Sequence, residues 1–203
     1  MSSDANETDG NGEPVLVALA ARGGSGEDVE LLIAAGADVA AVGADKRSAI
    51  HCAGEQGHAE VIRTLVRAGA NCNQTTGKGA TPLWVSCLNG QLGSLTALLD
   101  AKADVNQART NDGVTPLFIA CQKGHGSIVE ALLGRGADVN QATTDTGATP
   151  LYIACEEHHT PCFQLLALAR ADLALSCNGK TPLALASSKG FSDIVAVFES
   201  GSS

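Results

Sequence analysis

The sequence predicts an all-α protein built as a solenoid, in which short helix-loop-helix units stack on one another. Two observations carry this prediction. The strings ATPLWVSCLNG (80–90), VTPLFIACQKG (114–124), ATPLYIACEEH (148–158) and KTPLALASSKG (180–190) align without gaps, and self-similarity at a fixed period is the mark of repeat architectures. Only 3% of the 203 residues are aromatic although 44% are hydrophobic. The core must therefore be thin and filled by small and medium aliphatic side chains.

Two further copies of the repeat are degenerate. SAIHCAGEQGH (48–58) and VLVALAARGG (15–24) occupy the corresponding register without a Thr-Pro pair. A second string of the AGADV type follows each copy at intervals of about 33 residues. We therefore expect six repeats within 14–201, at about 14–43, 44–76, 77–110, 111–144, 145–176 and 177–201. Residues 1–13, which hold Asp4, Glu7, Asp9 and Glu13, are expected to form a disordered acidic tail.

Each repeat has its own helix signals. Thr81, Thr115, Thr149 and Thr181 precede proline, and threonine caps free backbone N–H groups while proline suits the first helical position. The first helix ends at Gly90, Gly124 or Gly190, where glycine adopts a left-handed conformation at little cost. The second helix carries one apolar stripe, such as Ile128, Val129, Leu132 and Leu133. A polar connector such as 138–147 then predicts a turn or a β-hairpin tip.

Together these motifs resemble the ankyrin repeat. The resemblance rests on Thr-Pro-Leu, Ala or Cys, Gly-His, Ile-Val, Leu-Leu and Gly-Ala-Asp-Val-Asn in that order, and it covers about nine-tenths of the chain. It implies protruding β-hairpin loops, a concave binding face, and protein–protein recognition rather than catalysis.

The sequence departs from this pattern at the histidine that follows Thr-Pro-Leu. That position is histidine only at His51, and it is Trp84, Phe118, Tyr152 and Ala184 in later repeats. We expect ring stacking to replace the hydrogen bond of the histidine there. The fifth repeat has His158 and Arg170 where glycine is expected, so we expect strain or fraying in it.

Charge and composition exclude several classes of protein. The net charge of −9 argues against nucleic-acid binding, which needs clustered Lys and Arg. The longest apolar run, 15–21, is far short of the roughly 20 residues of a membrane helix. The start MSSDANETDG has no secretory signal, and the odd number of seven cysteines fits free thiols. We expect a monomer without cofactors in the cytoplasm or the nucleus.

The strongest candidate for a metal site or a catalytic site is a group of four soft ligands. Cys155, His158, His159 and Cys162 lie within eight residues, and zinc accepts such a set. However, Cys155 occupies the same repeat position as Cys87 and Cys121, which have no histidine pair nearby. Core packing therefore explains it better. With no phosphate-binding loop and no catalytic set outside the repeat pattern, we expect no enzyme activity.

The candidate binding residues are those that vary between repeats. Such residues face outward in a solenoid, and by resemblance they project onto the concave face. They are Lys46, Arg47, Glu55, Gln56, Lys78, Leu88, Asn89, Asp112, Val114, Gln122, Lys123, Thr146, Glu156, Glu157, Lys180 and Lys189. The early repeats are locally basic and the fifth is acidic. We therefore expect a protein or peptide partner with an acidic end over the second and third repeats and a basic end over the fifth, and with uncharged contacts at Leu88 and Val114.

A different function, as a substrate for modification, stays open. Asn106 and Asn140 both lie in the pattern Leu, five residues, Asp-Val-Asn. This pattern is similar to that of hairpin asparagines that are hydroxylated in some ankyrin repeats.

Overall fold

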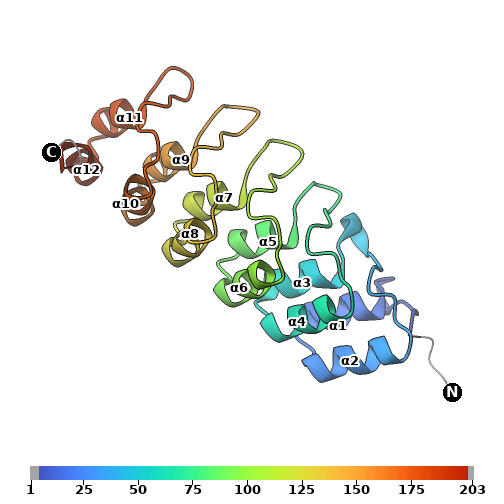
Figure 1. The fold of residues 1–203 in the computed structure, drawn as a ribbon. Helices are drawn as coiled ribbons and strands as arrows, with labels where there is room; N and C mark the ends of the chain where they lie inside the picture. Colours follow the sequence, from blue (N-terminus) through green and yellow to red (C-terminus); the bar gives the residue numbers. More distant parts are fainter. Residues whose placement is uncertain (1–4, 201–203) are drawn as a thin grey trace. The chain divides into compact units, whose positions relative to one another are not determined.

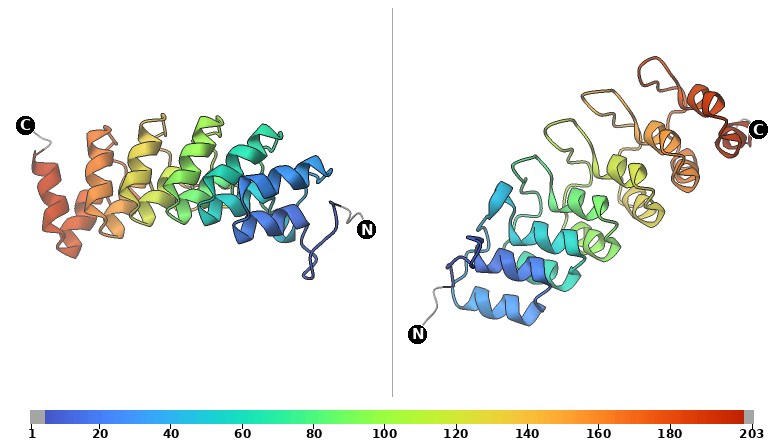
Figure 2. Two further views of the ribbon diagram at one scale, coloured as in Figure 1. Left: turned by 90° about the horizontal axis from the view of Figure 1, so that it is seen from below. Right: turned by 180° about the vertical axis from the view of Figure 1, so that it is seen from behind.

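The computed structural model describes residues 5–200 and divides into two compact units, of which the first ends at Asn111 and the second begins at Asp112. Within the described residues each unit consists of three pairs of α-helices. In each pair the second helix lies beside the first (Figure 2). The predicted all-α repeat fold is therefore confirmed.

The first unit stacks its helix pairs in two layers. The helices α1, α3 and α5 contact one another in order, as do α2, α4 and α6 (Figure 1). Their bounds are α1 Val15–Arg22, α2 Gly26–Ala34, α3 Ala49–Gln56, α4 Ala59–Arg67, α5 Pro82–Leu88 and α6 Leu92–Asp100, with a short 3₁₀ turn η1 at Ala44–Lys46.

The second unit repeats this arrangement. The helices α7, α9 and α11 form one layer, and α8, α10 and α12 form the other. Their bounds are α7 Pro116–Gln122, α8 Gly126–Leu133, α9 Pro150–Glu156, α10 Thr160–Leu168, α11 Pro182–Lys189 and α12 Ser192–Ser200.

The predicted helix starts and ends are confirmed. The Oγ1 atom of Thr81 accepts a hydrogen bond from the backbone N–H of Trp84 at 3.1 Å, and Thr115, Thr149 and Thr181 cap their helices in the same way. The glycines Gly90, Gly124 and Gly190 have φ of 72°, 71° and 75°, in the left-handed region that glycine adopts most easily.

The core consists of aliphatic side chains with few rings. In the first unit Leu83, Leu95 and Leu98 are fully buried, and in the second unit Phe163 and Leu166 are. Ala120, Cys121, Ala154 and Cys155 are also fully buried, which confirms that small residues fill the closest approaches. In α3 a Cβ atom on Gly54 would lie 2.9 Å from the Ser86 Oγ atom and 3.1 Å from the Pro82 carbonyl oxygen. This glycine lets α3 and α5 pack closely.

The connecting loops project away from the helices within each unit (Figure 1). Among the described residues they contain isolated β-bridges, such as Val42 with Ser48 and Cys177 with Lys180, but no longer strands. Asparagine side chains join successive loops. The Oδ1 atom of Asn73 accepts from the backbone N–H of Asp104 at 2.9 Å, and that of Asn140 accepts from Asp172 at 2.8 Å.

The N-terminal segment differs from the expected disordered tail. The side chain of Asn6 bonds the carbonyl oxygen of Gly36 and the N–H of Asp38, at 3.0 and 2.8 Å. Asp9 forms an ion pair of 2.6 Å with Arg22. These contacts hold residues 5–13 against the first helix pair, because their side chains find backbone and basic partners there. Residues 1–4 lie outside the described residues.

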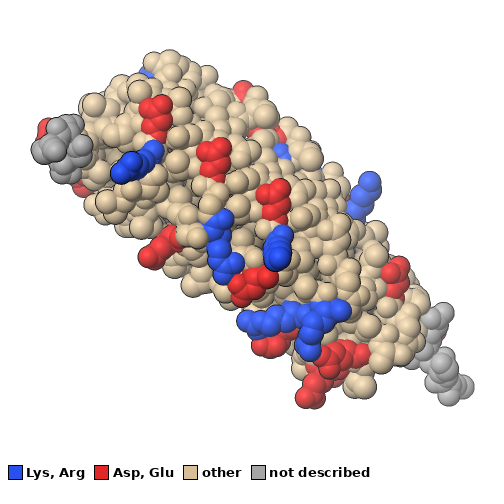
Figure 3. All heavy atoms as spheres, viewed as in Figure 1, with Lys and Arg blue, Asp and Glu red and all other residues tan. Residues whose placement is uncertain are grey.

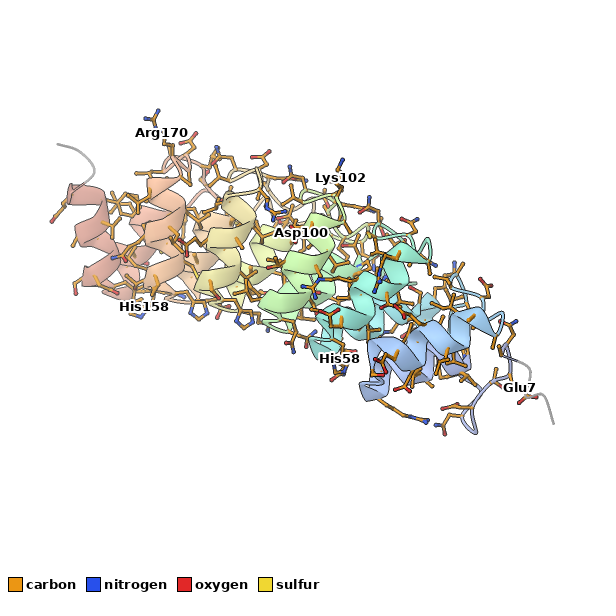
Figure 4. All side chains as sticks on the ribbon, turned by 60° about the horizontal axis from the view of Figure 1, so that its bottom comes forward. Glu7, His58, Asp100, Lys102, His158 and Arg170 are labelled. Atoms are coloured by element: carbon orange, nitrogen blue, oxygen red, sulfur yellow. The ribbon has the colours of Figure 1, made fainter. Side chains whose placement is uncertain are left out.

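The fifth repeat carries the backbone strain that its missing glycines suggest. His158 and Arg170 have φ of 56° and 64°, a region that side chains with a Cβ atom adopt at a cost. They lie at opposite ends of the α10 region (Figure 4). The ring of His158 stacks on Phe191 with centroids 3.8 Å apart.

No helix among the described residues is both long enough and apolar enough to cross a bilayer.

Candidate functional site

The first position of interest is the one that follows Thr-Pro-Leu in the repeat, where the repeat pattern has histidine. In α3 this position is His51, which is fully buried; its Nδ1 atom faces the N–H of Ser48 and its Nε2 atom lies 3.2 Å from the carbonyl oxygen of Ala80. Burial lowers the pKa of His51 to about 4, so the ring is neutral. It therefore ties α3 to the segment that leads into α5.

In α5 the same position is Trp84, whose environment is different. Its indole is 5% exposed, and the buried Nε1 atom has no hydrogen-bond partner. The guanidinium carbon of Arg109 lies 4.5 Å from the centre of the ring, which is cation–π geometry. The expectation of ring stacking is wrong for Trp84, because an arginine of the next connector covers its ring.

A cavity of about 250 Å³ lies beside Trp84 in the first unit. Five predicted binding residues converge on it from α3, α5 and the loops before them. They are Arg47, Glu55, Lys78, Leu88 and Asn89. The remaining lining residues are Asp45, Thr76, Ala80, Trp84, Val85 and Arg109. We call this cavity the Trp84 cavity.

A second cavity of about 290 Å³ adjoins the first. Asp45 and Arg47 line both cavities, and the second continues over α1 and α3 at Glu13, Val17, Ala18, Ala21, Ala44 and Cys52. The two cavities together extend along the layer of α1, α3 and α5.

Charges at the Trp84 cavity are mixed, with three basic and two acidic side chains in its lining. Arg47 is paired with Glu55, whereas Lys78 is exposed. Acidic and basic side chains also lie beside one another on the face of the first unit that Figure 3 draws. The helices α2 and α4 are joined by the 3.2 Å ion pair between Arg67 and Glu30.

The other predicted residues of the first unit lie outside the cavity lining. Lys46 and Gln56 are exposed, and Lys46 has a left-handed backbone with φ of 57°. They flank the cavity in sequence without lining it.

In the second unit most predicted residues are exposed on or near α7, α9 and α11. Lys123, Thr146, Glu156, Glu157, Lys180 and Lys189 are exposed, while Asp112 and Gln122 are half-buried. The Nζ atom of Lys189 donates to the carbonyl oxygen of Glu156 at 3.0 Å. This contact joins α9 to α11.

The prediction for Val114 is wrong. Its side chain is only 8% exposed, and it lies directly before Thr115, the residue that caps α7. It therefore offers no uncharged surface contact. Leu88 remains at the surface, half-buried in the lining of the Trp84 cavity.

The four soft ligands of the fifth repeat do not converge. Cys155 and Cys162 are fully buried, and burial raises the pKa of both thiols, that of Cys155 to about 11. The Cys155 thiol donates to the carbonyl oxygen of Pro182 at 3.3 Å.

The two histidine rings face other partners. His158 donates to Asp193 at 2.9 Å and His159 donates to the carbonyl oxygen of Gln122 at 3.2 Å. No group of three or more metal-ligating side chains occurs among the described residues. Each side chain of the set thus has a structural role.

The candidate asparagines of the loops are half-buried. Asn140 uses its Oδ1 atom to hold Asp172, as described above, and the N–H of Asn106 donates to Asp104 at 2.9 Å. Their hydroxylation stays a prediction.

Sequence reasoning did not place Trp84 and Arg109 beside the predicted binding residues in the lining of the Trp84 cavity. The available signal was that Trp84 is the single tryptophan of the chain and stands at a position where the repeat pattern calls for a hydrogen-bonding ring. Arg109 gave no signal of its own, since it lies in a connector without periodicity.

Comparisons with known proteins agree with this architecture. The family model of ankyrin repeats matches the chain in three copies, over residues 1–76, 55–143 and 141–201. The human ASB11 ankyrin repeat domain, a crystal structure, is 26% identical with a TM-score of 0.81, over 93% of this chain and 83% of that one.

A curated relative is similar over a shorter stretch. The ankyrin repeat and KH domain-containing protein mask-1 of Caenorhabditis elegans is 40% identical over 86 residues. The match takes in 41% of this chain and 3% of that protein, so the chain spans only a small part of its relative. The repeat motifs, the paired helices and the family model together show that the chain belongs to the ankyrin repeat family.

Proposed function

We propose that the chain is a non-enzymatic adaptor or scaffold that binds a protein or peptide on the surface formed by the first helices of its repeats. Ankyrin repeats are in general protein–protein interaction modules. The observation that carries the proposal is the convergence of five variable residues, from Arg47 to Asn89, on the Trp84 cavity. Variable positions that share one cavity are what a binding surface requires, since the repeat itself does not need them.

The partner proposed here is a protein segment rather than a nucleic acid or a small molecule. The net charge of −9 opposes phosphate backbones. The two cavities that share Asp45 and Arg47 run over α1, α3 and α5, and a surface of this length suits an extended segment. In the second unit the exposed Glu156 and Glu157 offer contacts to a basic segment of the same partner.

We propose further that the chain acts as a monomer in the cytosol or the nucleus. Its seven free cysteines support a reducing compartment. Gel filtration with light scattering tests the monomer, and imaging of the tagged chain in its own cells tests the compartment.

The binding surface is tested by affinity capture from native cells with two matched triple variants. The first variant, K78Q/L88A/N89S, changes the Trp84 cavity. The second variant, K102Q/L92A/T96S, makes similar changes at exposed positions on or next to α6.

Partners that the wild type and the control variant capture, and the cavity variant loses, support the proposal. Both variants must give the wild-type circular dichroism spectrum. An unchanged set of partners on the folded cavity variant would contradict the proposal and move binding to the loops or the outer helices.

A further inference from the structure

The Trp84 indole contains a hydrogen-bond donor without an acceptor. Its Nε1 atom is buried and makes no hydrogen bond, the sole case of this kind among the buried side-chain nitrogens and oxygens of the described residues. Buried polar groups in native proteins are nearly always paired, and each exception calls for an explanation. At the same repeat position His51 satisfies both of its ring nitrogens.

The unpaired donor belongs to a side chain that lines the Trp84 cavity. One face of its ring is covered by the guanidinium group of Arg109. Lys78 also lines the cavity; it is exposed and has no hydrogen bond or ion pair within the described residues. An ammonium group and an indole N–H thus border one space.

The charges of the lining favour an anionic group. The lining holds three basic and two acidic side chains, a formal charge of +1, and within it Arg47 and Glu55 form an ion pair. This basic surplus occurs on a chain whose net charge is −9. Hydrogen bonds in which the acceptor is a carboxylate are about twice as strong as neutral ones.

We propose that the Trp84 cavity binds an acidic side chain, Asp or Glu, of a protein partner. This proposal rests on the proposed function and names the chemistry of the partner. The carboxylate pairs with Lys78 and accepts the hydrogen bond of the Trp84 Nε1–H group. The guanidinium group of Arg109 lies over the face of the ring, so the carboxylate approaches the N–H group at the edge of the ring.

The single tryptophan makes the proposal directly measurable. In a ¹⁵N–¹H correlation spectrum the wild-type chain shows one indole N–H resonance, that of Trp84. Titration with hexaglutamate is expected to move this resonance downfield in a saturable manner, as the N–H gains a charged acceptor. Hexaglutamine and hexalysine of the same length serve as controls and are expected to leave it in place.

Two variants measure the contribution of each group to affinity. The Kd of fluorescein-labelled hexaglutamate, measured by fluorescence anisotropy at fixed salt, is expected to rise about tenfold or more in W84F and in K78Q. W84F keeps an aromatic ring but removes the donor together with part of the indole, so it is compared with K78Q, which leaves the indole in place. K102Q removes a lysine outside the cavity and is expected to stay within about twofold of wild type.

The opposite results overturn the proposal. They are an indole resonance that hexaglutamate does not move, or unchanged affinity in both W84F and K78Q. The resonance is read on the wild type, so this arm does not depend on the folding of a variant. A dT oligonucleotide that binds more tightly than hexaglutamate and moves the resonance would also overturn it, in favour of a phosphate ligand.

Failure of the proposal that the cavity binds an acidic side chain can be distinguished from failure of the proposed function. If the K78Q/L88A/N89S variant loses its captured partners while hexaglutamate leaves Trp84 unaffected, the binding surface stands and the acidic anchor is wrong. If hexaglutamate binds as expected but capture is unchanged, the cavity recognises carboxylates and the surface is not where the cellular partner docks.

Discussion

The Nε2 atom of His51 lies 3.2 Å from the carbonyl oxygen of Ala80, 29 residues further along the chain. Because Nδ1 faces the N–H donor of Ser48 at 3.2 Å, Nε2 carries the proton and donates it to Ala80. In the neutral ring both nitrogens are satisfied, whereas a proton on Nδ1 would face the N–H group of Ser48. This bond links one repeat to the next and makes the link sensitive to pH.

The first prediction is a loss of stability in mild acid. The pKa of His51 is lowered to about 4 by burial, which the hydrogen bond to Ala80 partly offsets, whereas unfolded histidine titrates near 6.5. The unfolded chain therefore takes up the proton first as the pH falls. The contribution of His51 is complete above about pH 6.5 and is lost between pH 6.5 and 4, by about 3 kcal/mol.

Urea denaturation at pH 7 and at pH 4.5 checks this prediction. H51Q removes the titrating ring and is expected to show a smaller change between the two pH values, starting from a lower stability. An H51Q variant with the same pH dependence as the wild type would assign the effect to other groups.

The second prediction concerns Gly54. A Cβ atom there would meet Ser86 and the backbone of Pro82 at 2.9 and 3.1 Å, so α3 and α5 would have to separate. We expect G54A to lower the free energy of unfolding by about 1–3 kcal/mol, although alanine is the better helix former. In α8 a Cβ atom on Gly126 meets nothing within 4 Å, so thermal melts of G126A should show no loss.

The third prediction separates the ring of Trp84 from its N–H group. Since the Nε1 atom makes no hydrogen bond, replacing it costs no bond, and Phe118 already occupies the corresponding position one repeat later. Chemical denaturation should show that W84F changes the free energy of unfolding by less than about 1 kcal/mol. W84A, which empties the site, should cost about 3–5 kcal/mol. A loss in W84F as large as that in W84A would contradict this prediction.

The fourth prediction concerns thiol reactivity. Cys72 is half-buried, whereas Cys52, Cys87, Cys121, Cys155, Cys162 and Cys177 are buried. A thiol reacts as the thiolate and needs access to the reagent. Ellman's reagent should therefore modify about one thiol per folded chain quickly and the others only in denaturant. The fast phase should disappear in C72S, and its survival there would identify another exposed thiol.

The fifth prediction concerns the last helix pair. The pKa of Asp193 is lowered to about 2, chiefly by the hydrogen bond from His158 and then by that from Thr160. Its contribution to stability is present above the ordinary value of 3.8 and is lost as the pH falls toward 2. At neutral pH, D193A should speed amide hydrogen exchange in α12. E199A removes the same charge from the same helix and should leave the exchange rates near those of the wild type.

Features that depend on a few neighbouring residues were predictable from the sequence. The Thr-Pro starts and the glycine ends of the helices are examples, because each cap is a hydrogen bond or a backbone conformation confined to one turn. The repeat period then places a pair of helices six times among the described residues, four of them with the Thr-Pro start.

Features that depend on side chains from different segments were not predictable. The contact between Trp84 and Arg109 joins a helix to a connector 25 residues later, and nothing periodic marks Arg109. Val114 varies between repeats as a surface residue does, yet it is buried, since variation alone does not distinguish a surface position from a packing position. Asn6 and Asp9 resemble solvated tail residues until their backbone and arginine partners are known.

The asparagine bonds between loops have a mechanical consequence. Each one spans a single repeat length, from Asn73 to Asp104 in the first unit and from Asn140 to Asp172 in the second. A force applied to the ends of either unit is therefore resisted by short-range bonds in series. Such a stack should extend by losing one repeat after another, and it should recoil readily because each released repeat has a neighbour on which to form again.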